Sequence, residues 1–322
     1  MNILVTGIAG FIGFNLANEL INSNHNILGI DNFISSYDHK IISKRQIILA
    51  KKKIPILESD INDLDLNQLL SFIKKNTENG RIDVIIHLAA WPGVLRSTKE
   101  PEKYFKNNIS GFMKVAVLTK ILQPKKFLYA SSSSVYGNLG SKKKCSENDR
   151  LPDALNFYAL TKQINEKISE QIFLNLELQH CALRFFTVVG PWGRPDMAYW
   201  KFADAIKNNE KILLRGEYGG YRDFTSVFDV VEIISKLIET KNTLPSVLNI
   251  AKGEANPTTD LINMLSQNLE LEPDISYIER EKTEAEVTVS DSSNLDLVVP
   301  GHSWRNLKIT VEDFANWYSE LN

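Results

Sequence analysis

The sequence predicts an α/β fold built on a doubly wound parallel sheet, with a smaller lobe at its C-terminal side. Two observations predict it. From Ile3 to about Cys181, short runs rich in β-branched residues alternate with longer segments whose apolar residues recur at helical spacing, which is the pattern of successive βαβ units. A glycine-rich turn joins the first run to the first helical segment. Right-handed crossovers in such a chain place helices on both faces of the sheet.

Each expected element follows from its own local pattern. Strands are expected where short apolar runs end at polar or turn residues, at residues 3–6, 26–30, 54–58, 84–87, 126–129 and 176–183. Helices are expected where apolar residues return every three or four positions, at residues 11–23, 64–76, 102–122 and 158–174.

A second lobe is expected to begin after residue 189. Gly, Pro and aromatic residues cluster at 190–195 and 216–221, and the strand-helix alternation weakens there. The chain therefore divides into a sheet domain, residues 1–189, and a lobe, residues 190–322. In the lobe we expect helices at 197–208, 228–239, 258–268 and 311–321 and a strand at 247–250, which may instead return to the sheet edge.

Composition favours a small molecule as the partner. The 37 Lys and Arg nearly cancel the 39 Asp and Glu among 322 residues, so the chain has no strong field for nucleic acid or an anionic membrane. No apolar stretch approaches the roughly 20 residues that span a bilayer. Two cysteines, Cys145 and Cys181, fit free thiols in the cytoplasm. No histidine lies at metal-ligand spacing, so no metal is predicted, and His87 is expected in the core.

The turn after the first strand reads Thr6-Gly7-Ile8-Ala9-Gly10-Phe11-Ile12-Gly13, the glycine spacing of a dinucleotide site on a Rossmann fold. Gly7 permits the turn, Gly10 lets the backbone approach a pyrophosphate, and Gly13 lets the helix pack on the strand. Asp31 ends the second strand, where its carboxylate would take the ribose hydroxyls and repel a 2'-phosphate. NAD is therefore favoured over NADP.

Residues after two further strands lie at the same carboxyl edge of the sheet, where doubly wound folds bind ligands. They are Asp60-Ile61 after the third strand and Leu88-Ala89-Ala90 after the fourth. Asp60 is equally expected as a helix cap.

A catalytic group is expected downstream of the fifth strand. Tyr158 and Lys162 stand at i and i+4 on one helical face, where an ammonium stabilises a phenolate. A free tyrosine titrates near ~10, so this neighbour and a positive nicotinamide must lower its pKa for work at neutral pH. Ser132, in the run of Ser131 to Ser134 at the strand end, is expected to hold the same substrate hydroxyl.

These motifs resemble the extended short-chain dehydrogenase/reductase family over nearly the whole chain. The family's Gly-x-x-Gly-x-x-Gly, Ser/Thr strand end and Tyr-x-x-x-Lys are matched at Gly7, Gly10, Gly13, Ser132, Tyr158 and Lys162. The resemblance implies that Asn108 helps to order the active site, and that a homodimer forms through residues 102–122 and 158–174. The residues expected to bind NAD are Gly7, Gly10, Phe11, Ile12, Gly13, Asp31, Asn32, Asp60, Ile61, Leu88, Ala89, Ala90, Asn108, Tyr158 and Lys162.

The stretch from Arg184 to Ala198, which contains Gly190-Pro191-Trp192-Gly193-Arg194-Pro195-Asp196, is similar to the UDP-glucuronate 4-epimerases of that family. The resemblance implies a 4-epimerase of a UDP-hexuronate that oxidises C4, lets the sugar turn and reduces it again. It also implies that Arg222 binds the diphosphate. The residues implied to hold the C6 carboxylate are Ser133, Ser134, Thr187 and Arg194.

Some features leave other activities open. Related dehydratases and decarboxylases carry acids near the catalytic serine, where this chain has Ser134, which favours epimerisation. Leu95 stands where the related epimerases have an arginine, with Arg96 one residue on, and residues 283–287 also depart from the family pattern. A 4-epimerase of UDP-glucose or UDP-N-acetylglucosamine is the first alternative. A sugar-nucleotide dehydrogenase, reductase or decarboxylase, and a non-enzymatic protein on this fold, are more distant ones.

Overall fold

The computed structural model describes residues 1–322 except 35–36, 38, 139–143, 280–285 and 322. Its centre is a seven-stranded sheet in the order β11-β6-β5-β4-β1-β2-β3, in which every neighbouring pair is parallel. The doubly wound sheet predicted from the sequence is confirmed. Its strands are β1 (Asn2–Thr6), β2 (Asn26–Asp31), β3 (Ile56–Glu58), β4 (Val84–His87), β5 (Lys126–Ser132), β6 (Gln179–Phe185) and β11 (Val247–Ile250).

The strand order reverses around β1. Leu4 of β1 lies beside Leu28 of β2 on one side and Ile85 of β4 on the other. The crossovers from these two neighbours leave in opposite directions, which opens a crevice at the carboxyl ends of the strands. This reversal positions the glycine-rich turn that follows β1.

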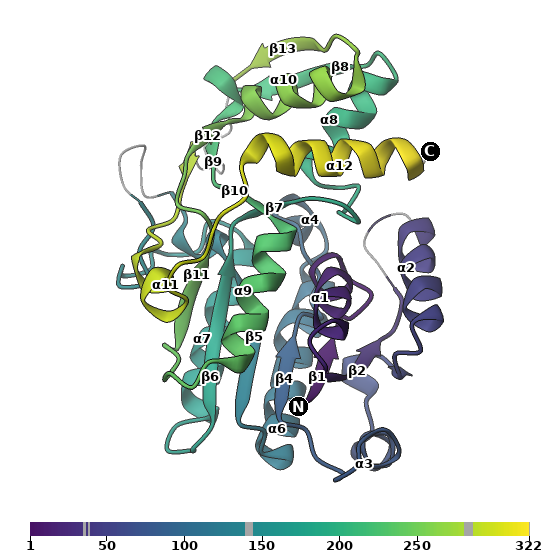
Figure 1. The fold of residues 1–322 in the computed structure, drawn as a ribbon. Helices are drawn as coiled ribbons and strands as arrows, with labels where there is room; N and C mark the ends of the chain where they lie inside the picture. The colour runs from purple at the N-terminus through teal and green to yellow at the C-terminus, as the bar shows by residue number, and fades with distance from the viewer. Residues whose placement is uncertain (35–36, 38, 139–143, 280–285, 322) are drawn as a thin grey trace.

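Helices cover both faces of the sheet (Figure 1). One core contains Phe14 of α1 (Phe11–Ile21) and Val231 of α9 (Val227–Glu239), and these two helices pack side by side. The opposite core is formed with the apolar faces of three other helices, α3 (Leu66–Asn76), α6 (Gly111–Leu122) and α7 (Phe157–Ile172). Two separate cores fit a chain of this size.

The C-terminal lobe lies above the carboxyl edge of the sheet (Figure 1). Its core joins Trp200 of α8 (Ala198–Lys207), Leu261 of α10 (Thr258–Leu269) and Phe314 of α12 (Leu307–Leu321). A parallel pair, β8 (Lys211–Arg215) and β13 (Asp274–Ile278), covers one side of the lobe.

Short elements carry the chain between the sheet and the lobe. In the first pair β7 (Thr187–Val189) runs parallel to β10 (Phe224–Ser226). In the second group β9 (Tyr221–Arg222) lies between β12 (Asn256–Pro257) and β14 (Val287–Thr288). The remaining short helices are η1 (Ile61–Asp63), α4 (Val94–Lys99), α5 (Pro101–Tyr104), η2 (Phe105–Ser110), η3 (Ser133–Tyr136), η4 (Glu217–Gly219) and α11 (Ser293–Val298).

The expected strand at 247–250 returns to the sheet as β11 beside β6, as one of the two alternatives held. The predicted helix at 102–122 is wrong as one continuous element, because a π-helical turn, η2, divides it into α5 and α6. The helix α2 (His39–Lys51) was not predicted, because only Ile41, Ile42, Arg45 and Leu49 of it are buried and its apolar face is short. Among the described residues, no helix is long and apolar enough to cross a membrane.

Candidate active site

A cavity of about 710 Å³ lies between the carboxyl edge of the sheet and the lobe. It brings together nearly all the residues singled out in the sequence, although they come from eight separate segments of the chain. Asn108 is the exception, since it lies behind the lining. The predicted residues that line the cavity are Gly7, Gly10, Phe11, Ile12, Gly13, Asp31, Asn32, Asp60, Ile61, Leu88, Ala89, Ala90, Ser132, Ser133, Ser134, Tyr158, Lys162, Thr187, Arg194 and Arg222.

The glycine turn is held by close backbone packing. Gly7 has a φ of +70°, and a Cβ there would lie 2.7 Å from the Ala89 nitrogen. A Cβ on Gly13 would lie 2.2 Å from the Gly7 carbonyl oxygen. Only glycine fits either position, and the first turn of α1 therefore sits directly on the end of β1. The free N–H groups at this helix N-terminus form a place for a phosphate group.

Two carboxylates lie beside the glycine turn, in the part of the cavity that is called the cofactor end below. Asp31 accepts N–H bonds from Ala9 and Phe33, each of 2.8 Å, and burial raises its pKa against these hydrogen bonds. Asp60 accepts the Asn62 N–H at 2.8 Å, which caps η1, and also the Asn32 side-chain N–H at 2.9 Å. Asp60 thus fulfils both expectations, a helix cap and a lining residue.

The three catalytic candidates meet in the middle of the cavity. Asn156 caps α7 by accepting the Ala159 N–H at 2.9 Å, and the first two turns of the helix present Tyr158 and Lys162. The Lys162 Nζ lies 5.8 Å from the centre of the Tyr158 ring and donates to the Ala130 carbonyl at 2.9 Å. The shared helical face predicted from their spacing is present in the structure.

The charges around Tyr158 differ from the expectation. Burial raises the pKa of Tyr158, while a hydrogen bond with Ser132 and the positive charge of Arg194 oppose that rise. Burial also lowers the pKa of Lys162 to about 8, against the charge of Glu166. The expected lowering of the tyrosine pKa by the protein's own lysine is therefore corrected, because burial outweighs the nearby charges. The cation acting on this phenol is Arg194.

Asn108 lies in the π-helical turn η2 and holds the loop that follows β4. Its Oδ1 accepts the Trp91 N–H at 2.7 Å and its Nδ2 donates to the Trp91 carbonyl at 2.9 Å. The buried Tyr104 hydroxyl donates to the Pro92 carbonyl at 2.6 Å. These contacts position a loop that lines the cavity, so Asn108 shapes the site from behind.

The part of the cavity lined by residues 91–94, Ser133, Ser134 and Arg194 is called the sugar end below. It contains an arginine that is paired with a carboxylate. Arg194 Nε and Nη2 donate to the two carboxylate oxygens of Asp196 at 2.9 and 2.7 Å. Ser133 and Ser134 lie in η3, and the Ser132 hydroxyl contacts the Ser134 hydroxyl at 3.2 Å. A negatively charged ligand that binds Arg194 must share it with Asp196.

The loop that departs from the family pattern lines the cavity with Trp91, Pro92, Gly93 and Val94. The Leu95 side chain is 60% exposed. Arg96 pairs with Glu100 at 3.3 Å and lies 5.1 Å from the Trp91 ring. The shifted arginine, on α4, thus contacts Glu100 at the junction of α4 and α5 and the ring of Trp91. The second departure lies partly outside the described residues, at 283–285; in its described part, the Glu286 carbonyl accepts a bond from Arg222 at 3.0 Å.

Two arginines of the site escaped the sequence analysis. Arg45, on α2, is fully buried and donates to the Ala9 carbonyl at 2.8 Å and to the Trp192 and Gly193 carbonyls at 2.5 and 2.9 Å. No motif marks it. Arg215 lines the far end of the cavity together with Arg222. Its position before the Gly216 turn is a signal that could have been used.

His87 lies in the core, as predicted. It is 5% exposed, and its Nδ1 lies 2.7 Å from the Thr6 hydroxyl. Burial and the charge of Lys162 lower its pKa to about 3, so it is neutral near pH 7.

The chain is similar to known proteins along its whole length. Residues 3–251 match the NAD dependent epimerase/dehydratase family. Protein CapI of Staphylococcus aureus is 31% identical over 339 residues, which cover 99% of each chain. The probable UDP-glucuronate 4-epimerase of Rhizobium meliloti (strain 1021) is 38% identical over 241 residues, 74% of this chain and 68% of that protein.

A solved structure extends this similarity to three dimensions. UDP-glucuronic acid 4-epimerase from Bacillus cereus, crystallised with UDP-glucuronic acid and NAD, superposes with a TM-score of 0.90 at 30% identity and full coverage of both chains. The family match covers most of the chain and the shared fold covers all of it. The protein therefore belongs to the NAD-dependent epimerase/dehydratase family.

Proposed function

We propose that this protein is an NAD-dependent 4-epimerase that interconverts UDP-glucuronate and UDP-galacturonate. The observation that carries the proposal is the single cavity, which joins a dinucleotide turn, a Tyr-Lys-Ser group and an arginine at the sugar end. Relatives and a solved structure named for this reaction support the choice of substrate.

The residues of the cofactor end fit NAD. Gly7 and Gly13 leave no room for a Cβ, so the turn packs closely on the end of β1 and the loop after β4, and Gly10 lets the backbone approach a pyrophosphate. The first turn of α1 offers its N–H groups to phosphate oxygens, and the Asp31 carboxylate would meet the ribose hydroxyls. NAD in this position supplies a hydride acceptor, and later a hydride donor, for one sugar carbon.

The chain's own catalytic work is proton transfer. Tyr158 accepts the proton of the 4-hydroxyl, while Ser132 holds that hydroxyl by a hydrogen bond. The positive charge of Arg194 favours the ionised form of the phenol. We propose that the Lys162 ammonium, 5.8 Å from the centre of the ring, adds to this effect when NAD is bound. Once the 4-keto sugar has turned, Tyr158 returns the proton to the C4 oxygen, and hydride from the cofactor would reach the other face of C4, so that the configuration at C4 is inverted.

The sugar end would hold the substrate during this turn. Arg222 and Arg215 line the far end of the cavity, where forked cations suit a diphosphate. Arg194, Ser133, Ser134 and Thr187 would bind the C6 carboxylate. The anchor has to stay in place while the sugar turns.

One observation favours a second candidate, a 4-epimerase of a neutral UDP-sugar such as UDP-glucose or UDP-N-acetylglucosamine. Asp196 already pairs with Arg194 through two hydrogen bonds, so the cation has an internal partner. A neutral sugar would leave this pair intact.

The exposed apolar residues of α6 and α7 support a homodimer. Met113, Val117 and Ile121 of α6 are 40, 45 and 51% exposed, and Leu160 of α7 is 38% exposed. A second copy of the chain that packs here would bury them in a four-helix arrangement.

We further propose the cytoplasm as the compartment, supported by the two free cysteines. We also propose that residues 1–189 and 190–322 form two domains, and that α9 and β11 of the second domain pack against the first.

The test is an assay of purified protein with UDP-glucuronate, UDP-galacturonate, UDP-glucose and UDP-N-acetylglucosamine, followed by NMR of the anomeric and H4 protons. We expect UDP-glucuronate to become its galacto isomer with no net change in NAD. Activity on the neutral sugars alone would establish the second candidate. Loss of carbon dioxide, or accumulation of NADH, would replace epimerisation with decarboxylation or net oxidation.

A further inference from the structure

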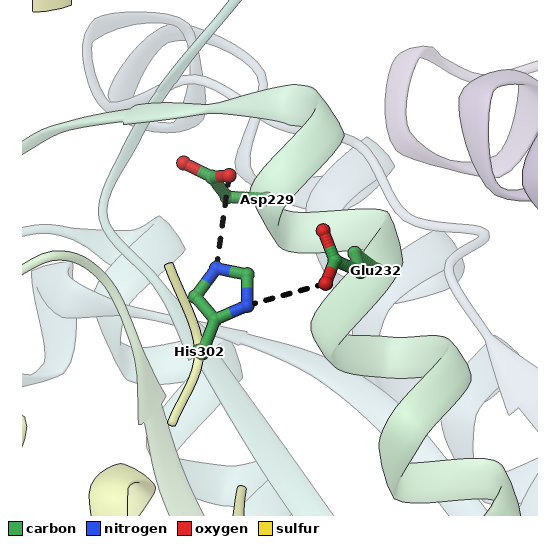
Figure 2. Close-up of side chains that lie close together, drawn as sticks. All are labelled: Asp229, Glu232 and His302. Carbon is green, nitrogen blue, oxygen red and sulfur yellow. Dashed lines mark ion pairs between the residues drawn. The ribbon is translucent and has the colours of Figure 1, made fainter. Parts of the chain in front are cut away.

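Three metal-ligand side chains meet outside the active-site cavity (Figure 2). Asp229 and Glu232 project from one side of α9, and His302 comes from the segment that precedes α12. One ring nitrogen of His302 faces each carboxylate: Nε2 lies 3.6 Å from Asp229 Oδ1, and Nδ1 lies 3.5 Å from Glu232 Oε1. One donor atom from each residue lies within 4.8 Å of the others.

The inner half of this cluster is buried and incompletely hydrogen-bonded. The side chains of Asp229 and His302 are 2% and 1% exposed. Among the described residues, neither Asp229 Oδ1 nor His302 Nε2 has a hydrogen-bond partner. Buried polar atoms without a partner are uncommon and call for an explanation. These two atoms face each other at 3.6 Å, just beyond hydrogen-bond distance.

The outer half of the cluster already attracts a cation. The ammonium of Lys236 lies 2.7 Å from Glu232 Oε1 and 3.4 Å from His302 Nδ1. Glu232 is 40% exposed, so water reaches this side. A carboxylate oxygen and an imidazole nitrogen directed at one cation are a ligand pair that suits a divalent transition metal.

We propose that Asp229, Glu232 and His302 form a binding site for a divalent transition metal ion of the zinc type. Glu232 and His302 Nδ1 bind the ion in place of the Lys236 ammonium, and water completes the coordination. Asp229 accepts the Nε2–H of the same ring, as carboxylates behind metal-bound histidines do. This arrangement gives the two unpartnered buried atoms a hydrogen bond to each other.

The site would connect two parts of the fold. Asp229 Oδ2 also accepts the N–H of Arg305 at 3.0 Å, so the segment before α12 is already attached to α9. A bound ion would add a second link between α9, which packs on the sheet, and the segment that leads into the C-terminal lobe. Because α9 lies outside the cavity lining, this proposal does not depend on the proposed epimerase activity.

Histidine spacing gave no sign of this site. Asp229 and Glu232 stand at i and i+3 on a helix, but His302 is far from them in the sequence and only the fold brings it there. Arg305 Nε, at 3.7 Å from Asp229 Oδ1, reduces the negative charge and is expected to moderate the affinity.

The test uses tag-free full-length protein freed of metal with EDTA. Zinc binding is measured by isothermal titration calorimetry, and copper binding by electron paramagnetic resonance. We expect one zinc ion per chain, a copper spectrum with coupling to a single imidazole nitrogen, and an increase of the melting temperature in zinc. His302→Ala should abolish the site. Asp229→Asn should weaken it about 10- to 100-fold, and Lys236→Gln should strengthen it several-fold.

The control is His25→Ala. His25 also pairs with a carboxylate of α9, Glu239, at 3.1 Å. The substitution therefore removes a similar imidazole that contacts the same helix, and zinc binding should stay unchanged. Glu232→Gln changes a partly exposed side chain and is expected to fold even if His302→Ala does not. Zinc binding that survives Glu232→Gln or His302→Ala, or that is lost in His25→Ala, would overturn the proposal.

Discussion

At the cofactor end of the cavity the backbone determines the shape, whereas at the sugar end the side chains do. Gly7 and Gly13 are packed so closely that no Cβ fits, and the groups offered to a ligand are mainly N–H groups of α1. At the sugar end, Arg194 is held by Asp196, and the serines lie in the short helix η3.

This difference distinguishes the features of the site that the family shares from the features that decide which substrate one member of the family binds. Backbone packing tolerates little change, so the cofactor end is common to many activities. A pair of side chains can be exchanged without disturbing the fold. We therefore expect substrate choice to be decided at the sugar end, from Trp91 to Val94 and from Arg194 to Asp196.

The largest expected effect lies between the two ends, at Tyr158. Tyr158→Phe removes the proton acceptor but no cofactor contact of the backbone. Turnover should fall about 10²- to 10⁴-fold, while NAD affinity, measured by fluorescence titration, stays close to that of the wild type. Undiminished turnover would remove Tyr158 from the mechanism.

A change at the sugar end should discriminate between substrates. Arg194→Met removes a charged donor to the C6 carboxylate, worth about 1.5–3 kcal/mol, or roughly 10- to 150-fold in kcat/KM for UDP-glucuronate. kcat/KM for UDP-glucose should fall less, by only the part that the Arg194 charge contributes at the Tyr158 phenol. Arg222→Met is the matched control, since the diphosphate is common to both substrates and both should suffer. An equal loss for the two sugars in Arg194→Met would contradict the carboxylate role.

A change at the cofactor end should instead affect every substrate alike. Gly13→Ala places a Cβ against the Gly7 carbonyl, so the turn must shift, at a cost of about 1–3 kcal/mol in stability. NAD affinity should fall in parallel, as measured by calorimetry. Gly111→Ala in α6 is the control, because a Cβ there meets only ordinary contacts at 3.7 Å and alanine favours a helix. Normal NAD binding by Gly13→Ala would disprove the packing argument.

The smallest expected effect is in the pH profile. The pKa of Lys162 is lowered to about 8, so its ammonium is present below that pH and is lost as the pH rises through it. kcat/KM should therefore fall above pH 8, by about tenfold per pH unit at most. Lys162→Arg, whose charge does not titrate in this range, should lose this descending limb. A wild-type profile that stays flat to pH 9.5 would show that the lysine charge is not needed.

The sequence alone predicted what depends on periodicity and backbone. The parallel sheet and the helices α1, α3, α7 and α9 follow from local patterns, and the glycine turn from the absence of side chains. The π-helical turn at Asn108 could not be found, because its reason is the distant loop at Trp91 that it holds. The helix α2 was missed because few of its residues are buried.

In the candidate site, the motif residues were predicted and their electrostatic balance was not. The spacing of Tyr158 and Lys162 gives a shared face, but the burial that raises the pKa of the phenol depends on packing by residues far away in the sequence. The pairing of Arg194 with Asp196 depends on a turn conformation that the sequence does not reveal. The role of each site residue stays a prediction until the variants above are measured.

The buried Arg45 connects the two ends of the cavity mechanically. Its guanidinium donates to Ala9 in the glycine turn and to Trp192 and Gly193, which directly precede Arg194. A displacement of the pyrophosphate turn is thereby transmitted to the loop beside the sugar without passing through the catalytic groups. Loss of the dinucleotide should therefore weaken the binding of the sugar. We expect the nucleotide sugar to dissociate faster from the enzyme without dinucleotide than from the enzyme with dinucleotide bound.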